Sequence, residues 1–348
     1  MHSSKTEEIR RQLRERIGSG VYPAGSRIPS EYTLAEEFSV NKKTANKAVD
    51  ALVAEGLLAR GTGGAGTIVI KRSSFPKGRI AFISAAYPYQ MRILTGLQRS
   101  ALEYGYAVTV FFPETVDCLP LLEMLHSSRI DGIVFCSDFG SLARDCRLPC
   151  VTVDNDASMK QGVCDVVNVN NRIGGKLIMD EVIRRGHREV VIFSSGGHFT
   201  DRRNRITGFF DSMRRAGIPG PRERLFFGGH YDDEAAVDAM KCIFRTFPAT
   251  TAIVCDADDA ACSILRAAQK LDRHPAVTAF GNSLNGAERL AAVEQFPERL
   301  GAAACRTLVH RITNGPGTPA REFITPQVVF PEAIPVIGAD RRHREPLS

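Results

Sequence analysis

Residues 25–58 read GSRIPSEYTLAEEFSVNKKTANKAVDALVAEGLL, and this stretch holds two helix patterns close together. Pro29-Ser30-Glu31 starts the first, because a serine oxygen accepts hydrogen bonds from free N–H groups and a glutamate suits a first helical turn. Apolar residues within 34–38 give this helix one apolar face. Ser39-Val40 then forms a turn, and Asn41 caps the second helix. We therefore expect two short helices joined by a tight turn.

The flanking sequence completes a small domain. Apolar residues recur every four positions within 5–19, which predicts one more helix ahead of the pair. The second helix of the pair stops at Glu55-Gly56, and residues 57–59 and 67–70 read as two short strands joined by a glycine-rich loop. Two helices across a turn, followed by a hairpin, form a DNA-reading unit whose second helix enters the major groove. The first seventy residues therefore predict a winged helix-turn-helix.

The charge distribution favours the same function. Residues 1–77 hold 13 lysines and arginines against 8 aspartates and glutamates, whereas the rest of the chain holds 32 against 31. A basic domain on a near-neutral body suggests a polyanion partner. The loop 61–67 also resembles a phosphate-binding loop, but it lacks the closing Gly-Lys-Ser/Thr, so a wing is the favoured interpretation. The residues expected to contact DNA are Arg27, Ser30, Tyr32, Asn41, Lys42, Lys43, Thr44, Asn46, Lys47, Gly63, Gly64, Gly66 and Thr67.

This domain resembles the DNA-binding domain of GntR-family transcription regulators. The resemblance covers residues 5–70 in order and is carried by Gly25-Ser26-Arg27-Ile28-Pro29-Ser30-Glu31, Leu34-Ala35, Phe38-Ser39-Val40, Thr44, Ala48, Leu52, Glu55-Gly56-Leu57 and Gly64-Ala65-Gly66-Thr67. Tyr32 stands where the family often has an arginine that contacts DNA. The second helix of the pair begins with Asn41-Lys42-Lys43-Thr44, where the family usually has Ser-Arg-x-Thr. Because lysine is a point charge and arginine a planar fork, the operator need not match a typical family site.

From residue 79 on, short apolar runs alternate with helix patterns. The runs expected to be strands are 80–83, 107–110, 132–135, 150–153, 190–193, 251–254 and 276–279, with helices such as 92–104, 174–185, 204–216 and 260–270 between them. Short buried strands that alternate with helices predict an α/β fold, with parallel sheets covered by helices on both faces. About 270 residues is large for one such sheet, so we expect two lobes. The expected organisation is a DNA-binding domain at 1–70, a linker at 71–78, a two-lobed effector-binding and dimerisation domain at 79–340 and a basic tail at 341–348.

The body resembles the effector domain of the LacI/GalR family, which shares its fold with periplasmic sugar-binding proteins. The matching pieces include Gly96-Leu97, Arg129-Ile130-Asp131-Gly132-Ile133, Leu148-Pro149-Cys150-Val151-Thr152-Val153-Asp154, Gly174-Gly175, Arg185-Gly186-His187, Arg205 with Gly208-Phe209, and Asp258 with Ala261. A GntR-type head on such a body resembles arabinose-repressor-type regulators. The resemblance implies a small-molecule effector bound between the lobes, with a sugar or related polyol favoured.

The resemblance also supplies candidate effector-binding residues. They are Tyr87, Tyr89, Asp154, Arg205, Asp258 and Asn282. Arg205 is the first choice as a clamp for hydroxyl groups, with a helix-surface arginine as the alternative, and either tyrosine can instead pack in the core. Ala257 stands where the family has asparagine, and Gly281-Asn282 replaces an Asp-Asp pair, so two common polar contacts are missing. The chain has no tryptophan, which leaves tyrosine or phenylalanine to stack on a ligand.

Other functional classes find little support in the sequence. Nine cysteines are scattered without a CxxC pair or a Cys/His ligand spacing, so neither a metal site nor a disulfide framework is expected. No catalytic motif and no cofactor site are evident, and no apolar run is long enough to span a membrane. We expect a cytoplasmic, ligand-responsive transcription regulator of the repressor type. It would bind double-stranded operator DNA as a homodimer. The alternative is a cytoplasmic solute-binding protein without working DNA readout.

Overall fold

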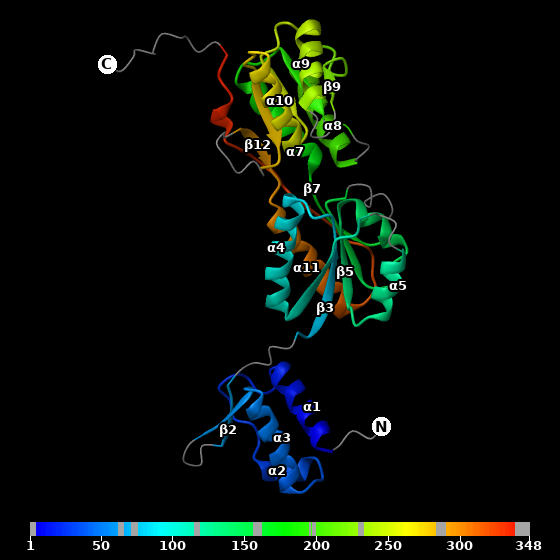
Figure 1. Cartoon of the computed structure of the whole chain (residues 1–348), viewed down its shortest axis with the longest axis vertical. Coiled ribbons are helices and arrows are strands. Elements are labelled where there is room, and N and C mark those ends of the chain that lie inside the picture. Colours follow the sequence, from blue (N-terminus) through cyan, green and yellow to red (C-terminus); the bar gives the residue numbers. More distant parts are fainter. Residues whose placement is uncertain are drawn as a thin grey trace, which may run out of the picture. The chain divides into compact units, whose positions relative to one another are not determined.

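The computed structural model describes residues 5–61, 66–70, 76–114, 119–155, 162–194, 196, 200–228, 233–282 and 290–337. The chain forms two compact units, residues 1–78 and residues 79–348, here called the head and the body. Figure 1 shows the helical head and the two sheets of the body. The expected α/β fold with a winged helix-turn-helix and a two-lobed body is confirmed.

The head packs three helices against a two-stranded hairpin. Its elements are α1 (Lys5–Gly18), α2 (Glu31–Glu37), α3 (Lys42–Ala54), β1 (Leu58–Arg60) and β2 (Thr67–Val69). The stripe of α1 predicted from the sequence is buried, and it packs with Leu34 of α2 and Leu52 of α3 in one core. Both predicted caps are present, since Ser30 accepts a hydrogen bond from the N–H of Thr33 and Asn41 accepts one from that of Thr44. These caps set the start of each helix of the pair and therefore the turn between them.

The first lobe of the body is a six-stranded sheet in the described residues, with the order β13-β7-β6-β5-β3-β4. Helices α4 and α11 cover one face, and α5 with the 3₁₀ helix η2 covers the other. Figure 1 shows α4 and α11 on one side of β3 and β5, with α5 on the opposite side. The bounds are β3 (Gly78–Ile83), α4 (Pro88–Tyr104), β4 (Tyr106–Phe111), α5 (Leu119–Ser127), β5 (Gly132–Cys136), η2 (Ser137–Arg144), β6 (Cys150–Val153), β7 (Asp165–Val169), α11 (Pro297–Asn314) and β13 (Arg321–Ile324).

The second lobe repeats this layering around a sheet with the order β14-β12-β11-β10-β8-β9. Helices α9 and α10 pack on one face, and α7 and α8 pack on the other. The bounds are α7 (Asn171–Arg184), β8 (Val190–Ser194), α8 (Thr200–Arg215), β9 (Leu225–Phe227), α9 (Asp233–Thr246), β10 (Ala252–Cys255), α10 (Asp258–Lys270), β11 (Ala276–Phe280), β12 (Ala291–Glu294), β14 (Gln327–Val329) and the 3₁₀ helix η3 (Pro331–Ala333).

The chain crosses between the lobes after β7, after β12 and after β13. The third crossing explains a departure from the prediction of parallel sheets, because β14 returns antiparallel to β12, with Ala292 opposite Val329. Strands β7, β9, β12, β13 and β14 were not predicted either. The residues of β9, β13 and β14 are half-buried or exposed, so these strands lack the continuous apolar run that marks a central strand. Strands β7 and β12 are buried, but Asp165 and Asn168 interrupt the apolar run of β7, and Glu294 shortens that of β12.

The expected domain boundaries fall close to these elements. Gly78, expected in the linker, is the first residue of β3, and residues 71–75 of that linker lie outside the described residues. The basic tail at 341–348 lies outside them as well. The expected strand 57–59 is β1 at Leu58–Arg60, displaced by one residue.

Two glycines let α7 and α8 cross at very close range in the second lobe. A Cβ atom added to Gly175 would lie 2.2 Å from the carbonyl oxygen of Arg205, and one added to Gly208 would lie 2.2 Å from that of Arg172. Neither backbone can accommodate a side chain at such a distance. The crossing therefore fixes the backbone at Arg205, the residue expected to clamp the effector.

Candidate functional site

Helix α3 presents three exposed lysines on the surface of the head. Lys42, Lys43 and Lys47 are exposed, and no carboxylate oxygen of the described residues lies within 4 Å of their ammonium groups. All three lie on one helix, and two of them are in its first turn. An unpaired, exposed lysine can exchange its solution counterion for a DNA phosphate.

The arginines of α1 are in a different position. Arg11 binds Glu8 at 2.7 Å and Glu15 at 2.7 Å, and Arg14 binds Glu55 at 2.7 Å. Arg10 also pairs with Glu55, at 2.9 Å. These carboxylates already neutralise the guanidinium groups. These arginines of α1 are therefore paired with carboxylates, whereas the lysines of α3 have no such partner among the described residues, although α1 contains more basic residues.

Arg60, which the sequence analysis did not single out, ties the hairpin to α2 and α3. It is the last residue of β1, and its Nη2 donates to Asn46 Oδ1 at 2.7 Å and to Asp50 Oδ1 at 2.6 Å. Its Nη1 donates to Glu31 of α2. Asn46 also donates from Nδ2 to Asp50 Oδ2 at 2.8 Å. Asn46, expected to contact DNA, thus has both ends of its amide in contact with other residues of the head.

Tyr32, which stands where the family often has an arginine, contacts Lys42, the first residue of α3. The ammonium nitrogen of Lys42 lies 3.8 Å from the centre of the Tyr32 ring, and both residues are exposed. A cation at this distance from an aromatic face is attracted to it. Tyr32 therefore orients Lys42, where an arginine at this position would repel it.

The wing is the hairpin of β1 and β2 with its connecting loop, and residues 58–61 and 66–70 of it belong to the described residues. Arg27 pairs with Ile68 of β2 through a single β-bridge and is exposed at the side of the hairpin. Gly66 has a positive φ of 77°, which suits glycine at the end of a tight loop. Thr67 is buried, so a DNA contact at this residue would use its backbone rather than its hydroxyl. Gly63 and Gly64 lie outside the described residues.

In the body, Arg205 of α8 is the centre of a buried polar network. It is 6% exposed, and Phe280 stacks on the guanidinium at 4.2 Å. Its Nε donates to Asn171 Oδ1 at 2.8 Å, and its Nη1 donates to the carbonyl oxygen of Asp256 at 2.9 Å. Its Nη2 reaches Asp201 Oδ2 at 3.2 Å. The alternative of a solvated helix-surface arginine is therefore wrong.

Gln295 connects this network to the first lobe. Its Oε1 accepts a hydrogen bond from Arg205 Nη2 at 3.1 Å and another from the Tyr89 hydroxyl at 3.4 Å. Tyr89 belongs to α4 of the first lobe, Arg205 belongs to α8 of the second, and Gln295 lies on the crossing after β12. Burial raises the pKa of Tyr89 well above its ordinary value, so the hydroxyl stays a donor. One buried amide thus joins two of the predicted effector residues across the lobes.

The ends of β5 and β6 bring Asp154 to the same region. Ser137 and Asp154, which directly follow these strands, both have positive φ angles, of 52° and 55°. Ser137 Oγ donates to Asp154 Oδ2 at 3.1 Å and accepts from Gln90 Nε2 at 3.2 Å. Residues without a glycine's freedom adopt this conformation at a cost, and such strain concentrates at functional sites. The carboxylate of Asp154 is close enough to stabilise the charge of Arg205.

Carboxylates from both lobes share this region. Asp256 at the end of β10 is buried, accepts a hydrogen bond from Ser194 Oγ at 2.5 Å and lies 3.9 Å from Arg202. Burial raises the pKa of Asp256. The pKa of Asp138 on η2 is also raised, first by burial and then by the negative charge of Asp201 in the other lobe. Lobe separation would relieve that repulsion.

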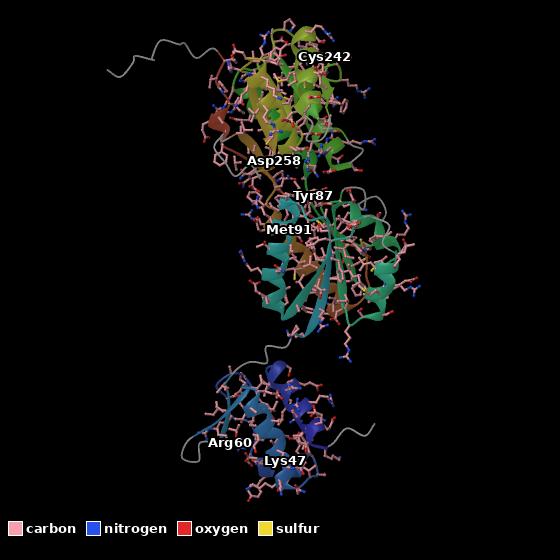
Figure 2. All side chains as sticks on the ribbon, in the orientation of Figure 1. Lys47, Arg60, Tyr87, Met91, Cys242 and Asp258 are labelled. Atoms are coloured by element: carbon pink, nitrogen blue, oxygen red, sulfur yellow. The ribbon has the colours of Figure 1, made fainter. Side chains whose placement is uncertain are left out.

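The remaining predicted effector residues lie at the margins of this network. Tyr87 is 61% exposed at the start of α4, and Asp258 is the first residue of α10. Figure 2 labels both, each at the end of its lobe that adjoins the other lobe. Asn282 donates to Glu294 Oε2 at 2.8 Å, which ties it to the end of β12. Of the six predicted residues, the structure brings Tyr89, Asp154 and Arg205 together.

Sequence reasoning missed the partners of these three residues. Each partner lies one or two residues past the end of a strand: Ser137 after β5, Asn171 after β7, Asp256 after β10 and Gln295 after β12. In parallel sheets ligands bind at the carboxyl ends of strands, so a search for polar residues at those ends would have found them. Within the described residues there is no group of three or more potential metal ligands.

Comparison with known proteins agrees with this architecture. Residues 81–332 match the family model described as periplasmic binding proteins and sugar binding domain of LacI family. The chain belongs to the LacI family. The head of this LacI-family chain matches a second family model, because residues 5–69 match the bacterial regulatory proteins of the gntR family. The predicted combination of a GntR-type head and a LacI-type body is confirmed.

Several relatives of this LacI-family protein are transcription regulators. The HTH-type transcriptional repressor PurR of Glaesserella parasuis serovar 5 (strain SH0165) is 28% identical over 267 residues, covering 71% of this chain and 76% of PurR. The PurR of Erwinia tasmaniensis is 28% identical over 246 residues, covering 66% of this chain and 72% of that protein.

Solved structures share the fold at lower identity. A transcriptional regulator CelR–cellobiose complex aligns with a TM-score of 0.64 at 18% identity, over 87% of this chain and 98% of that one. A LacI family transcriptional regulator from Enterococcus faecium with bound ribose aligns with a TM-score of 0.61 at 14% identity, over 72% of this chain and 96% of that one.

The two matched domains establish the class of this LacI-family protein. It is a ligand-responsive, DNA-binding transcription regulator, as the sequence predicted. None of the helices in the described part of the chain has the length and apolar character needed to cross a membrane.

Proposed function

We propose that this LacI-family regulator is a cytoplasmic repressor that binds a two-fold-symmetric operator as a homodimer. Helix α3 enters the major groove, and a polyol held between the lobes of the body changes the affinity for the operator. Helix-turn-helix dimers read two half-sites separated by about one helical turn or a multiple of it. The proposal of a repressor draws support from the PurR relatives, whose names describe repressors.

The proposed DNA contact rests on the charge pattern of the head. Lys43 and Lys47 are exposed and lie four residues apart on α3, so both can face one groove. Lys42 is held by the ring of Tyr32 at the same end of the helix. Each lysine that neutralises a phosphate should contribute about 0.9 to the slope of log K against log salt.

The DNA part is tested by selecting the purified full chain against randomised duplex DNA and sequencing what it retains. We expect an enriched two-fold-symmetric site. On that site, Lys43→Ala and Lys47→Ala should each lower the salt slope by about one. Arg11→Ala is the matched control, because Arg11 is already paired on α1. Failure to enrich any sequence at low salt would support the solute-binding alternative instead.

The observation that carries the effector part is the link from Tyr89 through Gln295 to Arg205. The two donors at this amide come from different lobes, so a ligand that takes up either donor changes how the lobes are held together. A hydroxyl group can replace the Gln295 oxygen as an acceptor, and the same hydroxyl can donate to Asp154. Guanidinium, carboxylate and phenol groups in a largely buried site suit a polyol.

The effector part is tested by measuring operator binding in the presence of ribose, cellobiose and further pentoses, hexoses and disaccharides. We expect one of these compounds to change operator affinity. Tyr89→Phe should then weaken the response by about tenfold in compound concentration, because it removes one hydroxyl while keeping the ring. Operator affinity without compound should stay within about threefold of the wild type. A response that is identical in Tyr89→Phe would remove Tyr89 from the site.

A further inference from the structure

Tyr32 is an aromatic side chain that lies outside the hydrophobic core of the head. It is the second residue of α2 and is 65% exposed, whereas Leu34 and Ala35 of the same helix are buried. One face of its ring meets the ammonium group of Lys42, whose nitrogen lies 3.8 Å from the ring centre. A tyrosine that packs against an exposed cation contributes to a surface of the domain rather than to its core.

Lys42 stands at an unfavourable place for a basic residue. It is the first residue of α3 and is followed by Lys43, and the first turn of this helix has no acidic residue. The helix dipole gives this end a partial positive charge, which favours acidic side chains and disfavours basic ones. Two lysines at this end do not stabilise the helix, so their position favours a role in binding an anion.

The nearest acidic residue in the sequence of α2 is already engaged. Glu31, which directly precedes Tyr32, binds Arg60 of the hairpin, a residue labelled in Figure 2. In the described part of the chain no carboxylate oxygen lies within 4 Å of the Lys42 ammonium. The ring of Tyr32 is thus the contact that the structure gives this ammonium. An ammonium has three N–H donors, so a ring on one side leaves donors free for DNA.

The contact restricts a side chain that is otherwise flexible. A lysine carries its charge on a four-carbon stem, and ordering that stem on binding costs free energy. Because Lys42 already rests on the ring, part of this cost is absent from the binding step. In helix-turn-helix domains the N-terminal residues of the second helix contact base edges. A lysine held in place there can distinguish one base pair from another, whereas a freely moving lysine mainly neutralises phosphate.

We propose that Tyr32 is a positioning residue for DNA recognition. It acts through Lys42, which it holds so that this lysine discriminates between base pairs, and it makes no base contact of its own. An arginine at position 32 would repel Lys42, so the side chain at this position decides which of the two residues reads the DNA. The inference rests on the proposed function in one respect, that α3 enters the major groove. It is independent of the homodimer, of the effector and of the phosphate contacts of Lys43 and Lys47.

The first test selects the full chain against randomised duplex DNA and compares the base preference at each position of the enriched site. We expect Lys42→Met to remove the preference at one position of the half-site. Tyr32→Leu should weaken the preference at that same position by about fivefold and leave the other positions unchanged. Tyr32→Phe should keep the wild-type preference, because it retains the face of the ring. Lys43→Met is the matched control, since it removes the same charge from the same turn, and it should keep the preference at that position.

The outcomes separate this inference from the proposed function. A wild type that enriches no sequence would overturn both. An enriched site whose base preferences are identical in the wild type and in Tyr32→Leu would overturn the positioning role of Tyr32 alone. A loss in Tyr32→Phe as large as that in Tyr32→Leu would also overturn it, because the hydroxyl group rather than the ring face would then be the contact.

A double-mutant cycle measures whether Tyr32 acts through Lys42. On the enriched site we expect Tyr32→Leu to lower the affinity of the wild type by about fivefold, but that of Lys42→Met by less than about 1.5-fold. Fluorescence anisotropy at fixed salt gives the four affinities. Both side chains are exposed, so the head stays folded in all four proteins. Equal losses in both backgrounds would show that Tyr32 contacts DNA directly, and tighter binding by Tyr32→Leu would show that the ring withholds Lys42; either result would overturn the proposal.

Discussion

At the scale of single residues, Arg60 shows how one side chain can set the electrostatics of a DNA-reading face. It pairs with Glu31 of α2 and with Asp50 of α3, the proposed recognition helix, and so neutralises both carboxylates. It also fixes the amide of Asn46. A guanidinium can serve all three acceptors at once because its donors form a planar fork.

We predict that Arg60→Gln weakens operator binding by about tenfold or more, because two uncompensated carboxylates then repel the DNA phosphates. Arg11→Gln on α1 should leave operator affinity within about twofold. Both are measured by fluorescence anisotropy at fixed salt. The double variant Arg60→Gln with Asp50→Asn should recover part of the loss. Equal affinities for wild type and Arg60→Gln would show that these carboxylates do not face the DNA.

His187 is a second residue whose role is structural. Its Nδ1 lies 2.9 Å from Thr251 Oγ1, and its Nε2 lies 2.9 Å from the carbonyl oxygen of Pro335. Burial lowers the pKa of His187. The folded protein therefore favours the neutral ring. The stabilisation is present above the unfolded pKa of about 6.5 and is lost as the pH falls through the folded value.

We predict that the free energy of unfolding of the wild type falls between pH 7.5 and pH 5.5, and that His187→Gln reduces this fall. The measurement is urea unfolding followed by circular dichroism, because the chain has no tryptophan. The comparison of the two proteins removes the contribution of other titrating groups. A fall of the same size in both would mean that His187 does not contribute to it.

At the scale of elements, the crossing of α7 and α8 shows how a pair of helices holds the proposed effector site. The glycines at the crossing bring the two backbones together at the carbonyl of Arg205. The side chain of Arg205 then reaches Asn171 at the first turn of α7. The same pair of helices therefore supplies both a donor and its acceptor.

We predict that Gly208→Ala destabilises the body by about 1–3 kcal/mol, because the added methyl group forces the helices apart. Displacement of Arg205 should also weaken the response to the effector. Arg203→Ala, on the exposed face of the same helix, should change the unfolding free energy by less than about 0.5 kcal/mol. Urea unfolding by circular dichroism compares the two. An unchanged stability for Gly208→Ala would mean that the helices can separate without cost.

At the scale of the whole molecule, the effector and the operator must act on each other reciprocally. Coupling of this kind typically amounts to about 1–3 kcal/mol, or about 5- to 150-fold in affinity. In the proposed function the two ligands bind different units of the chain, so a change in the arrangement of the body would connect them. The Gln295 link between the lobes is the element that such a change would alter.

We predict that saturating operator DNA changes the affinity of the protein for its effector by the same factor as the effector changes affinity for the operator. Isothermal titration of the effector, with and without operator, measures one factor, and anisotropy measures the other. Agreement within about twofold is expected. Effector affinity that does not depend on operator DNA would show that the body does not control the head.

The sequence by itself determined the classes of both units and most of their elements. Caps at Ser30 and Asn41 and the apolar stripe of α1 are local signals, since they depend on residues three or four positions apart. The central strand at 150–153 was predicted with its correct bounds because a fully buried strand reads as a continuous apolar run. The α/β fold of the body follows from the alternation of such runs with helix patterns.

Only the tertiary structure decided which polar residues act together. Arg205 was identified from a resemblance, but its partners Asn171, Asp256 and Gln295 lie 34, 51 and 90 residues away along the chain. The contact of Arg60 with Glu31 spans 29 residues, and the ring of Tyr32 on α2 meets Lys42 on α3. Hydrogen bonds and cation–ring contacts depend on distances of a few ångströms between side chains. Those distances are set by how helices and strands pack, which no pattern local to the sequence records.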